Sequence, residues 1–202
     1  SPFISVFQNL SVPGTLTTNS FAARVDLPAP TSCNSIIMGD LDGDGKQDIL
    51  IGTAQGNNAL SVFRNVSTPG TLTTNSFDPR VDYPAAGWVD TVTVGDLNGD
   101  GKLDVAMVNQ MDSTLALFEN IGTGNFTKSS LADRVDIESG YNPNGVTIVD
   151  LDGDGRPDVI FANTYDANFS IYRNINTGTN CTPAPSGITA WWPGEGNGND
   201  II

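Results

Sequence analysis

The strongest constraint on the fold of this chain is an acidic nine-residue segment that occurs three times. The copies read Asp-Leu-Asp-Gly-Asp-Gly-Lys-Gln-Asp at 40–48, Asp-Leu-Asn-Gly-Asp-Gly-Lys-Leu-Asp at 96–104 and Asp-Leu-Asp-Gly-Asp-Gly-Arg-Pro-Asp at 150–158, and they begin 56 and 54 residues apart. Oxygen-bearing side chains at positions 1, 3, 5 and 9, with glycine at 4 and 6, are typical of a short loop that wraps a hard cation such as Ca²⁺. Recurrence at this period predicts a repeat architecture with one ion per repeat.

The candidate ligands share their positions in the three loops. Side chains at positions 1, 3, 5 and 9 and the backbone carbonyl at position 7 would bind the ion, and the two glycines permit the positive φ that a tight curl requires. We expect the position 7 side chain to point to solvent. The candidate metal residues are Asp40, Asp42, Asp44, Lys46 and Asp48; Asp96, Asn98, Asp100, Lys102 and Asp104; and Asp150, Asp152, Asp154, Arg156 and Asp158. Because Asn98 carries no formal charge, we expect weaker binding in the middle loop.

Other interpretations of the loops fit less well. An EF-hand would need glutamate at position 12 and flanking helices, but that position holds Ile51, Met107 and Phe161. Mg²⁺ prefers near-octahedral sites that keep several waters. An Asp/Gly-rich turn without metal would hold three or four carboxylates in mutual repulsion. The sequence therefore predicts three bound Ca²⁺ ions.

Composition narrows the function classes. The net charge is −14, and 11 of the 23 acidic residues lie in the three loops, so the acidity is largely ligand supply. No basic face suggests a nucleic-acid partner, and no apolar run approaches the roughly 20 residues of a membrane span. The absence of histidine excludes Ser-His-Asp and Cys-His sites within the chain. A disulfide between Cys33 and Cys181 is allowed but not indicated.

A second register of similarity supports the repeat. Residues 5–29 and 61–85 are identical at 19 of 25 positions, a diverged copy spans 115–136, and a fourth begins at 170. Each unit predicts four short strands, and the segments directly after the loops are continuous apolar runs, typical of strands buried on both faces. The expected strands are 35–39, 91–95 and 145–149 before the loops; 48–52, 104–108 and 158–162 after them; 60–65, 115–120 and 169–174; and 77–83 and 126–137, with 21–27 as their equivalent.

The fold class expected from these strands is all-β. Four-stranded units at this spacing predict β-propeller blades, and three to three and a half blades form an open, incomplete propeller, since closure needs roughly four to eight. The expected boundaries are a partial blade 1–30, blades 31–85 and 86–139, a partial blade 140–175, a linker 176–187 and a truncated further domain 188–202. We expect the remaining blades of a parent chain, or a partner, to complete the ring.

With these patterns in view, the chain resembles the FG-GAP/VCBS repeat family, the bladed repeats also found in the integrin alpha-subunit head. The family pattern of Gly-Asp-Leu-Asn/Asp-Gly-Asp-Gly, a short residue pair, Asp and an apolar strand is present at 39–51, at 95–108 and, with Val149 as the leading residue, at 149–161. The resemblance implies a β-propeller with a structural Ca²⁺ in the first inter-strand loop of each blade, in an extracellular or cell-surface protein. The tail, with Trp191-Trp192-Pro193 and residues 195–200, resembles the start of a concanavalin-A-like or laminin-G-like lectin domain.

Three functions compete at this point. The leading one is a non-catalytic scaffold for adhesion or for binding a protein or glycan ligand. The second is an enzyme with paired carboxylates, for which the acids left over from the loops are Asp90, Asp112, Glu119, Glu138 and Asp166. The third is a carbohydrate-binding or accessory region of an extracellular polysaccharide-acting enzyme, with Trp88, Tyr141 or Tyr165 stacking on sugars rather than packing between blades.

Overall fold

The computed structural model describes residues 2–54, 59–175 and 188–193, the last segment as backbone only. Throughout these ranges the chain forms strands, turns and irregular connections and no helix. The described residues therefore contain no helix that could cross a membrane. The all-β class predicted from the sequence is confirmed.

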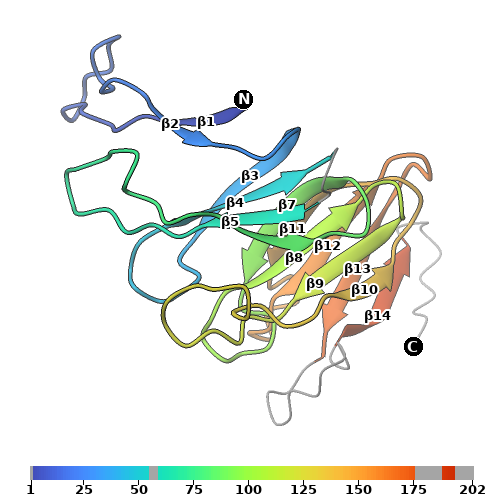
Figure 1. Ribbon diagram of the computed structural model, residues 1–202. Coiled ribbons are helices and arrows are strands. Elements are labelled where there is room, and N and C mark those ends of the chain that lie inside the picture. Colours follow the sequence, from blue (N-terminus) through green and yellow to red (C-terminus); the bar gives the residue numbers. More distant parts are fainter. Residues whose placement is uncertain (1, 55–58, 176–187, 194–202) are drawn as a thin grey trace.

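The strands form one two-stranded sheet and three four-stranded sheets, all antiparallel (Figure 1). Each sheet is made from consecutive strands, so each is a meander. The two-stranded sheet contains β1 (Phe3–Val6) and β2 (Val25–Pro28). The first four-stranded sheet contains β3 (Cys33–Gly39), β4 (Asp48–Thr53), β5 (Ala59–Phe63) and β6 (Val81–Pro84). The second contains β7 (Val89–Gly95), β8 (Asp104–Asn109), β9 (Thr114–Phe118) and β10 (Val135–Glu138). The third contains β11 (Pro143–Val149), β12 (Asp158–Asn163), β13 (Asn168–Asn174) and β14 (Ile188–Pro193).

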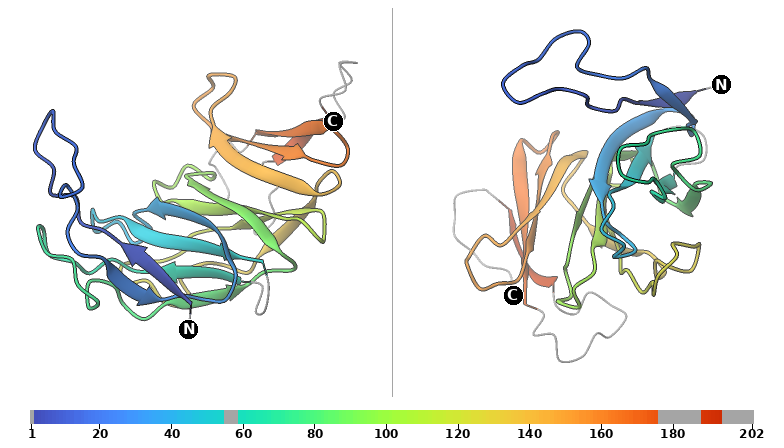
Figure 2. Two further views of the ribbon diagram at one scale, coloured as in Figure 1. Left: turned by 90° about the horizontal axis from the view of Figure 1, so that it is seen from above. Right: turned by 90° about the vertical axis from the view of Figure 1, so that its left-hand side faces the viewer.

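The sheets follow one another as an open arc. Strand β7 contacts both β3 and β11, so the first strands of successive sheets are neighbours. Figure 2 shows the sheets in order along the arc, with β1–β2 at one end and the third sheet at the other. Among the described residues the arc does not close into a ring, as expected for an incomplete propeller.

Each interface between sheets is an apolar core. Successive residues of β4 point to opposite neighbours: Leu50 joins the core shared with the second sheet, and Ile49 and Ile51 join the core shared with β1 and β2. Strand β8 divides in the same way, with Met107 in the first core and Val108 in the core shared with the third sheet. Every residue of β4 and β8 is buried. The prediction that the strands after the loops are buried on both faces is confirmed for β4 and β8, whereas in β12 Ile160 is half-buried and Ala162 is exposed.

Strand boundaries differ from expectation at two places. The first strand of each four-stranded sheet begins two residues earlier than predicted, across a shift in register such as that between Cys33 and Ser35. The strands expected over 77–83, 126–137 and 21–27 are reduced to β6, β10 and β2. The residues before each make one isolated bridge, namely Phe77 to Asn65, Leu131 to Asn120 and Phe21 to Asn9. At the Phe77 bridge the backbone N–H of Asn65 donates to the carboxylate of Asp48.

The third sheet has a fourth strand that the sequence did not suggest. Strand β14 pairs with β13, placing Trp191 opposite Tyr172 and Trp192 opposite Ile171. The segment interpreted as the start of a lectin-like domain thus occupies the outer-strand place that β6 and β10 hold in their sheets. The expected linker 176–187 and residues 194–202 lie outside the described residues, so the lectin-like domain stays a prediction. Cys181 lies there too, while Cys33 is an exposed free thiol.

Candidate metal centre

Each acidic loop connects the first and second strands of a four-stranded sheet. The loops leave β3, β7 and β11 and enter β4, β8 and β12 at the position 9 aspartate, which is the first residue of the second strand. The glycines at positions 4 and 6 have φ between 73° and 86° in all three loops. This left-handed conformation is one that glycine adopts without steric cost, as the sequence pattern predicted.

The position 1 aspartate folds each loop around its own carboxylate. The backbone N–H of the position 6 glycine donates to the Oδ2 atom of this aspartate at 2.9 Å in every copy, from Gly45 to Asp40, from Gly101 to Asp96 and from Gly155 to Asp150. The N–H of the position 5 aspartate donates to Oδ1 of the same carboxylate at 3.1–3.2 Å. The three loops therefore share one geometry.

The position 9 aspartate ties each loop to the body of its sheet. Asp48 is fully buried, and its two oxygens accept the N–H groups of Leu41 at 2.9 Å and Asn65 at 2.8 Å. Asp104 and Asp158 make the equivalent pairs of bonds at 2.8–3.0 Å. Burial raises the pKa of Asp48 and of Asp104 to about 6, since desolvation penalises the charged form.

Carboxylates converge in the first and third loops. Oxygen atoms of Asp40, Asp42 and Asp48 lie within 4.8 Å of one another, as do those of the equivalent residues at positions 1, 3 and 9 of the third loop, Asp150, Asp152 and Asp158. In the middle loop an amide replaces the carboxylate at position 3, so only Asp96 and Asp104 of this set are acidic. Three clustered anionic oxygens per loop suit a hard divalent cation that takes oxygen ligands. The donor set of the first and third loops thus fits Ca²⁺.

The position 7 side chains reach solvent only in part, because each also pairs with the position 5 aspartate of its loop. Lys46 Nζ lies 2.9 Å from Asp44 Oδ2, and Lys102 Nζ lies 3.3 Å from Asp100 Oδ2. Arg156 pairs with Asp154 in the same way. The hydrogen bond from Lys46 lowers the pKa of Asp44. The position 5 carboxylate and the other carboxylates of its loop repel one another, and the positive charge of the position 7 side chain offsets part of this repulsion.

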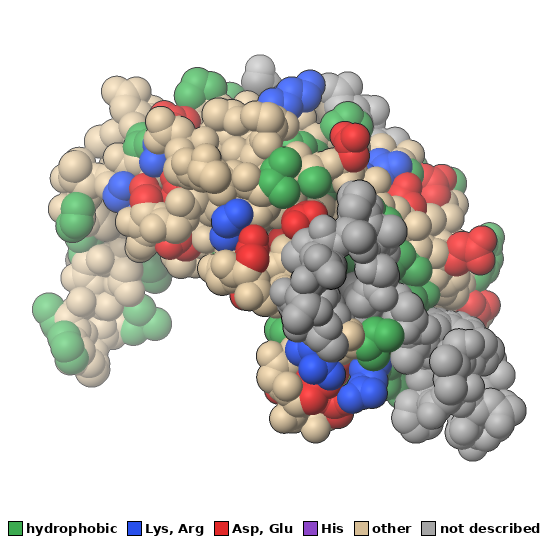
Figure 3. Space-filling model, turned by 90° about the horizontal axis from the view of Figure 1, so that it is seen from below, with side chains coloured by type: hydrophobic (Ala, Val, Ile, Leu, Met, Phe, Trp, Pro, Cys, Tyr) green, Lys and Arg blue, Asp and Glu red, His purple; other side chains and the backbone are tan. Residues whose placement is uncertain are grey.

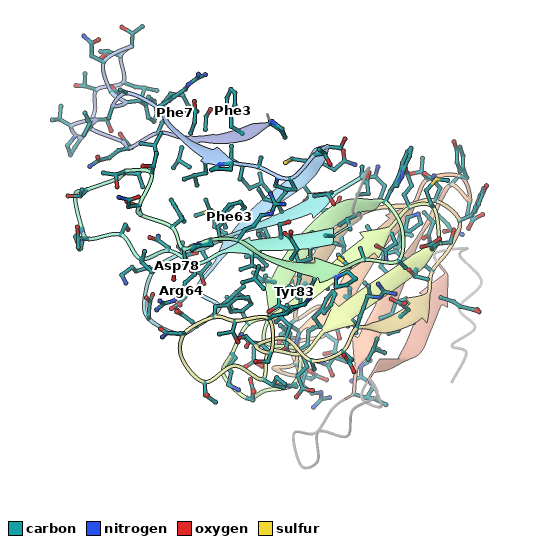
Figure 4. All side chains as sticks on the ribbon, viewed as in Figure 1. Phe3, Phe7, Phe63, Arg64, Asp78 and Tyr83 are labelled. Atoms are coloured by element: carbon teal, nitrogen blue, oxygen red, sulfur yellow. The ribbon has the colours of Figure 1, made fainter. Side chains whose placement is uncertain are left out.

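A further loop-facing residue in each repeat was missed by sequence reasoning. In each four-stranded sheet this residue immediately precedes the asparagine at or just beyond the end of the third strand. The three residues are Arg64, Glu119 and Arg173, which precede Asn65, Asn120 and Asn174. Each contacts the loop residue at position 3 of its own sheet. Figure 4 shows Arg64 beside Asp78. The only sequence signal was its constant place in the Phe/Tyr-x-Asn segments, which gave no hint of a contact about 20 residues away.

Some charged side chains outside the loops also form ion pairs, such as Arg24 with Asp26 and Arg80 with Asp82. In the view of Figure 3, Lys and Arg side chains lie beside Asp and Glu in small mixed groups. Of the acids considered for catalysis, Asp166 accepts the backbone N–H of Tyr141 at 2.5 Å, and Glu119 accepts from Asn98. Of the aromatic residues considered for sugar binding, Trp88 is 37% exposed and Tyr141 and Tyr165 are more than 60% exposed. The two tyrosine rings pack with centroids 5.3 Å apart.

Comparison with family sequence models places the loops in a known context. The FG-GAP-like repeat matches residues 40–107 and again residues 96–161, which together span more than half of the 202-residue chain. Each match begins at position 1 of one loop and ends in the strand that follows the next loop, so it covers a full structural period. Comparison with curated proteins gave no match. On this evidence, and on the all-β arc built from its repeats, the chain belongs to the FG-GAP-like repeat family.

Proposed function

We propose that this chain is a calcium-binding β-propeller repeat module that acts as a non-catalytic scaffold for adhesion or for protein or glycan interaction. The observation that carries the proposal is the repeated loop geometry: three loops with the same backbone contacts, two of which bring three carboxylates together. A bound Ca²⁺ would supply positive charge and oxygen coordination that offset carboxylate repulsion. The residues that would hold it are those at positions 1, 3, 5 and 9 and the carbonyl at position 7.

The role of the ion in this proposal is structural. The position 9 aspartate is buried and bonded to two backbone amides, one in its loop and one at the end of the third strand. An ion held by that carboxylate would fix the loop to both strands at once. FG-GAP-like repeats are generally non-catalytic, and the acids of the loops are the residues that binding would engage. The proposal therefore assigns the chain no catalytic residue.

The proposed setting is a secreted or cell-surface multidomain protein. FG-GAP repeats are typical of extracellular proteins, where Ca²⁺ is plentiful enough to fill sites of modest affinity. At the third-sheet end of the open arc, two apolar side chains are exposed: Val149, the last residue of β11, and Leu151, in the loop that follows it. We propose that further blades, from the parent chain or a partner, complete the propeller, and that the region from 188 onward leads to a lectin-like domain.

Glycan binding by the arc is a second candidate, favoured by the Tyr141–Tyr165 pair. Both rings are more than 60% exposed, and they lie in the connections at the end of the third sheet away from its acidic loop. Exposed aromatic rings offer a flat apolar face with a polar hydroxyl, which suits stacking on a sugar. Glycan-array binding by the full chain, compared with Tyr165→Ala and with Trp88→Ala, tests it. Binding that is unaffected by Tyr165→Ala would contradict this placement.

Calorimetric titration of the metal-free chain with CaCl₂ tests the leading proposal. We expect one ion per loop, and we expect the Asp96→Asn variant to lose the heat of one site. Asp112→Asn is the matched control, because it removes the same charge in the turn between β8 and β9, at the opposite end of the second sheet from the loop. No saturable heat from a folded chain would overturn the proposal, as would equal losses in the two variants.

A further inference from the structure

The loop-facing residues Arg64, Glu119 and Arg173 match the chemistry of position 3 in their own loops. Where position 3 is aspartate, the partner is a donor: Arg64 Nε donates to Asp42 Oδ2, and Arg173 Nε donates to Asp152 Oδ2 at 2.6 Å. Where position 3 is asparagine, the partner is an acceptor, since Asn98 Nδ2 donates to Glu119 Oε1 at 3.2 Å.

This pairing fixes which atom of position 3 faces the loop interior. In all three loops the Oδ1 atom accepts the backbone N–H of position 5, at 3.2 Å in Asp42, 2.9 Å in Asn98 and 3.2 Å in Asp152. An amide presents either oxygen or nitrogen, but only its NH₂ group can donate to a carboxylate. Glu119 therefore holds the Asn98 amide with its oxygen toward the loop, which is the atom that a cation would need.

The same pairing alters the charge around each loop. In the third loop, four aspartates face two cations, Arg156 and Arg173, which leaves a local charge of −2. In the middle loop, three aspartates and Glu119 face one cation, Lys102, which leaves −3. Among the described residues no cation forms an ion pair with Glu119.

The first loop resembles the third. Its four aspartates face Lys46 and Arg64, again leaving −2. Asp78 adds a carboxylate near Arg64, but it lies 3.5 Å from Nη1, the nitrogen that does not contact the loop, and its side chain is 47% exposed. Screening by water weakens such a surface charge. The third loop, where both arginines form ion pairs with loop aspartates alone, is therefore the cleaner comparison.

We propose that Glu119 makes the middle loop the tightest of the three Ca²⁺ sites, by orienting the Asn98 amide and by supplying the negative charge that Asn98 lacks. This inference rests on the proposed function, because it concerns the same loops. It reverses the affinity order expected from the loop sequences alone. For a divalent ion about 6 Å from a unit charge in a water-like dielectric, Coulomb's law gives an effect on the order of tenfold in affinity.

The test is a CaCl₂ titration of the metal-free full chain, followed by two-dimensional ¹H–¹⁵N NMR. The amides of Gly45, Gly101 and Gly155 serve as one reporter per loop, since each donates to the position 1 carboxylate at 2.9 Å. We expect Gly101 to reach half-saturation at a Ca²⁺ concentration about tenfold lower than Gly155 does.

Two reciprocal variants and one control separate Glu119 from general effects. Glu119→Gln should raise the Gly101 midpoint by about tenfold, and Arg173→Gln should lower the Gly155 midpoint by a similar factor. The control, Glu138→Gln, removes the same charge from β10 at the end of the sheet away from the loop, where Glu138 pairs with Thr114, and should leave all midpoints in place. Saturation of Gly101 together with or after Gly155, or no effect of Glu119→Gln, overturns this inference alone. Amides that do not respond to Ca²⁺ at all overturn the proposed function with it.

Discussion

The side chain of Asn120 donates a hydrogen bond of 2.8 Å to the backbone carbonyl of Leu41, a residue 79 positions earlier in the acidic loop of the preceding sheet. The same amide group donates to Leu103 in its own loop at 3.1 Å. Asn174 repeats the arrangement one sheet later, with bonds to Leu97 and Pro157. One buried amide thus joins the metal loops of two neighbouring sheets.

These contacts extend into a continuous chain of hydrogen bonds. Leu41 also donates its N–H to Asp48, and the N–H of Asn120 donates to Asp104, so the position 9 carboxylates of the first two loops are linked through Leu41 and Asn120. The corresponding bonds of Leu97 and Asn174 continue the series to the third loop. The loops are therefore mechanically connected across the arc.

Replacing Asn120 tests the contribution of this link to stability. We expect Asn120→Ala to lower the free energy of unfolding by about 1–3 kcal/mol, because it leaves the buried carbonyl of Leu41 without a donor. Asn65→Ala is the matched control: its side-chain oxygen also caps the residue two positions on, but its Nδ2 reaches only the exposed Gln47 carbonyl. Urea unfolding of both variants in EDTA makes the comparison. Equal losses would mean that the bond between sheets adds nothing.

The glycine at the end of the first strand explains one departure from the family pattern. A Cβ atom at Gly95 would lie 2.7 Å from Ile148 in the next sheet, so that side chain could not stay in place. The equivalent residue of the third sheet is Val149, which is 44% exposed in the described part of the chain. Glycine is therefore present where a following sheet packs against the strand.

This packing predicts a difference between two positions of the same register. Gly95→Ala should lower the free energy of unfolding by about 1–3 kcal/mol through overpacking. Val149→Ala, in the equivalent exposed place, should change it by about 0.5 kcal/mol or less. Thermal unfolding of the two variants measures both. A tolerated Gly95→Ala change would show that the second and third sheets pack less closely than the structure has them.

The Tyr83 hydroxyl crosses the same kind of interface and predicts a pH effect. It donates to the carbonyl of Thr127 in the second repeat at 2.5 Å, and burial raises the pKa of Tyr83 to about 12 from an ordinary 10.0. Its folded-state pKa is above the unfolded value, so the stabilisation is fully present below about pH 10 and is lost as pH rises through about 12. Tyr83→Phe should cost about 0.5–1.5 kcal/mol near neutral pH.

The measurement is the difference in unfolding free energy between wild type and Tyr83→Phe, taken from near neutral pH up to pH 12. The difference should shrink above pH 10. Tyr141→Phe provides the control, because Tyr141 is 61% exposed. A difference that stays constant over this range would argue against the Thr127 contact.

Local features of the fold and site could be read from the sequence, and contacts between distant segments could not. The glycines of the loops and the apolar strands after them depend on neighbouring residues, and the repeats display each pattern three times. The pairing of Asn98 with Glu119 joins positions 21 residues apart, and the bond from Asn120 to Leu41 joins different repeats. Such contacts depend on how strands and sheets pack, which periodicity does not encode.

A comparison within the repeats could have revealed part of what was missed. The residue before the repeated asparagine changes from Arg64 to Glu119 in the same repeat in which position 3 of the loop changes from aspartate to asparagine. That paired change is a sign of contact. A comparison of the repeats could not have revealed strand β14. Its sequence does not match the fourth strands of the other sheets, and a long connection separates it from β13, with which it pairs.

The most direct test of the central claim is thermal unfolding of the full chain in excess EDTA and in millimolar Ca²⁺. An ion that binds only the folded state stabilises it by ~2.7 kcal/mol per site at a hundred times its dissociation constant. With three loops of shared geometry, we predict a large upward shift of the melting temperature in Ca²⁺, much reduced in a variant carrying Asp40→Asn, Asp96→Asn and Asp150→Asn. A chain that folds in EDTA and melts at the same temperature in Ca²⁺ would contradict the assignment of the loops as structural calcium sites.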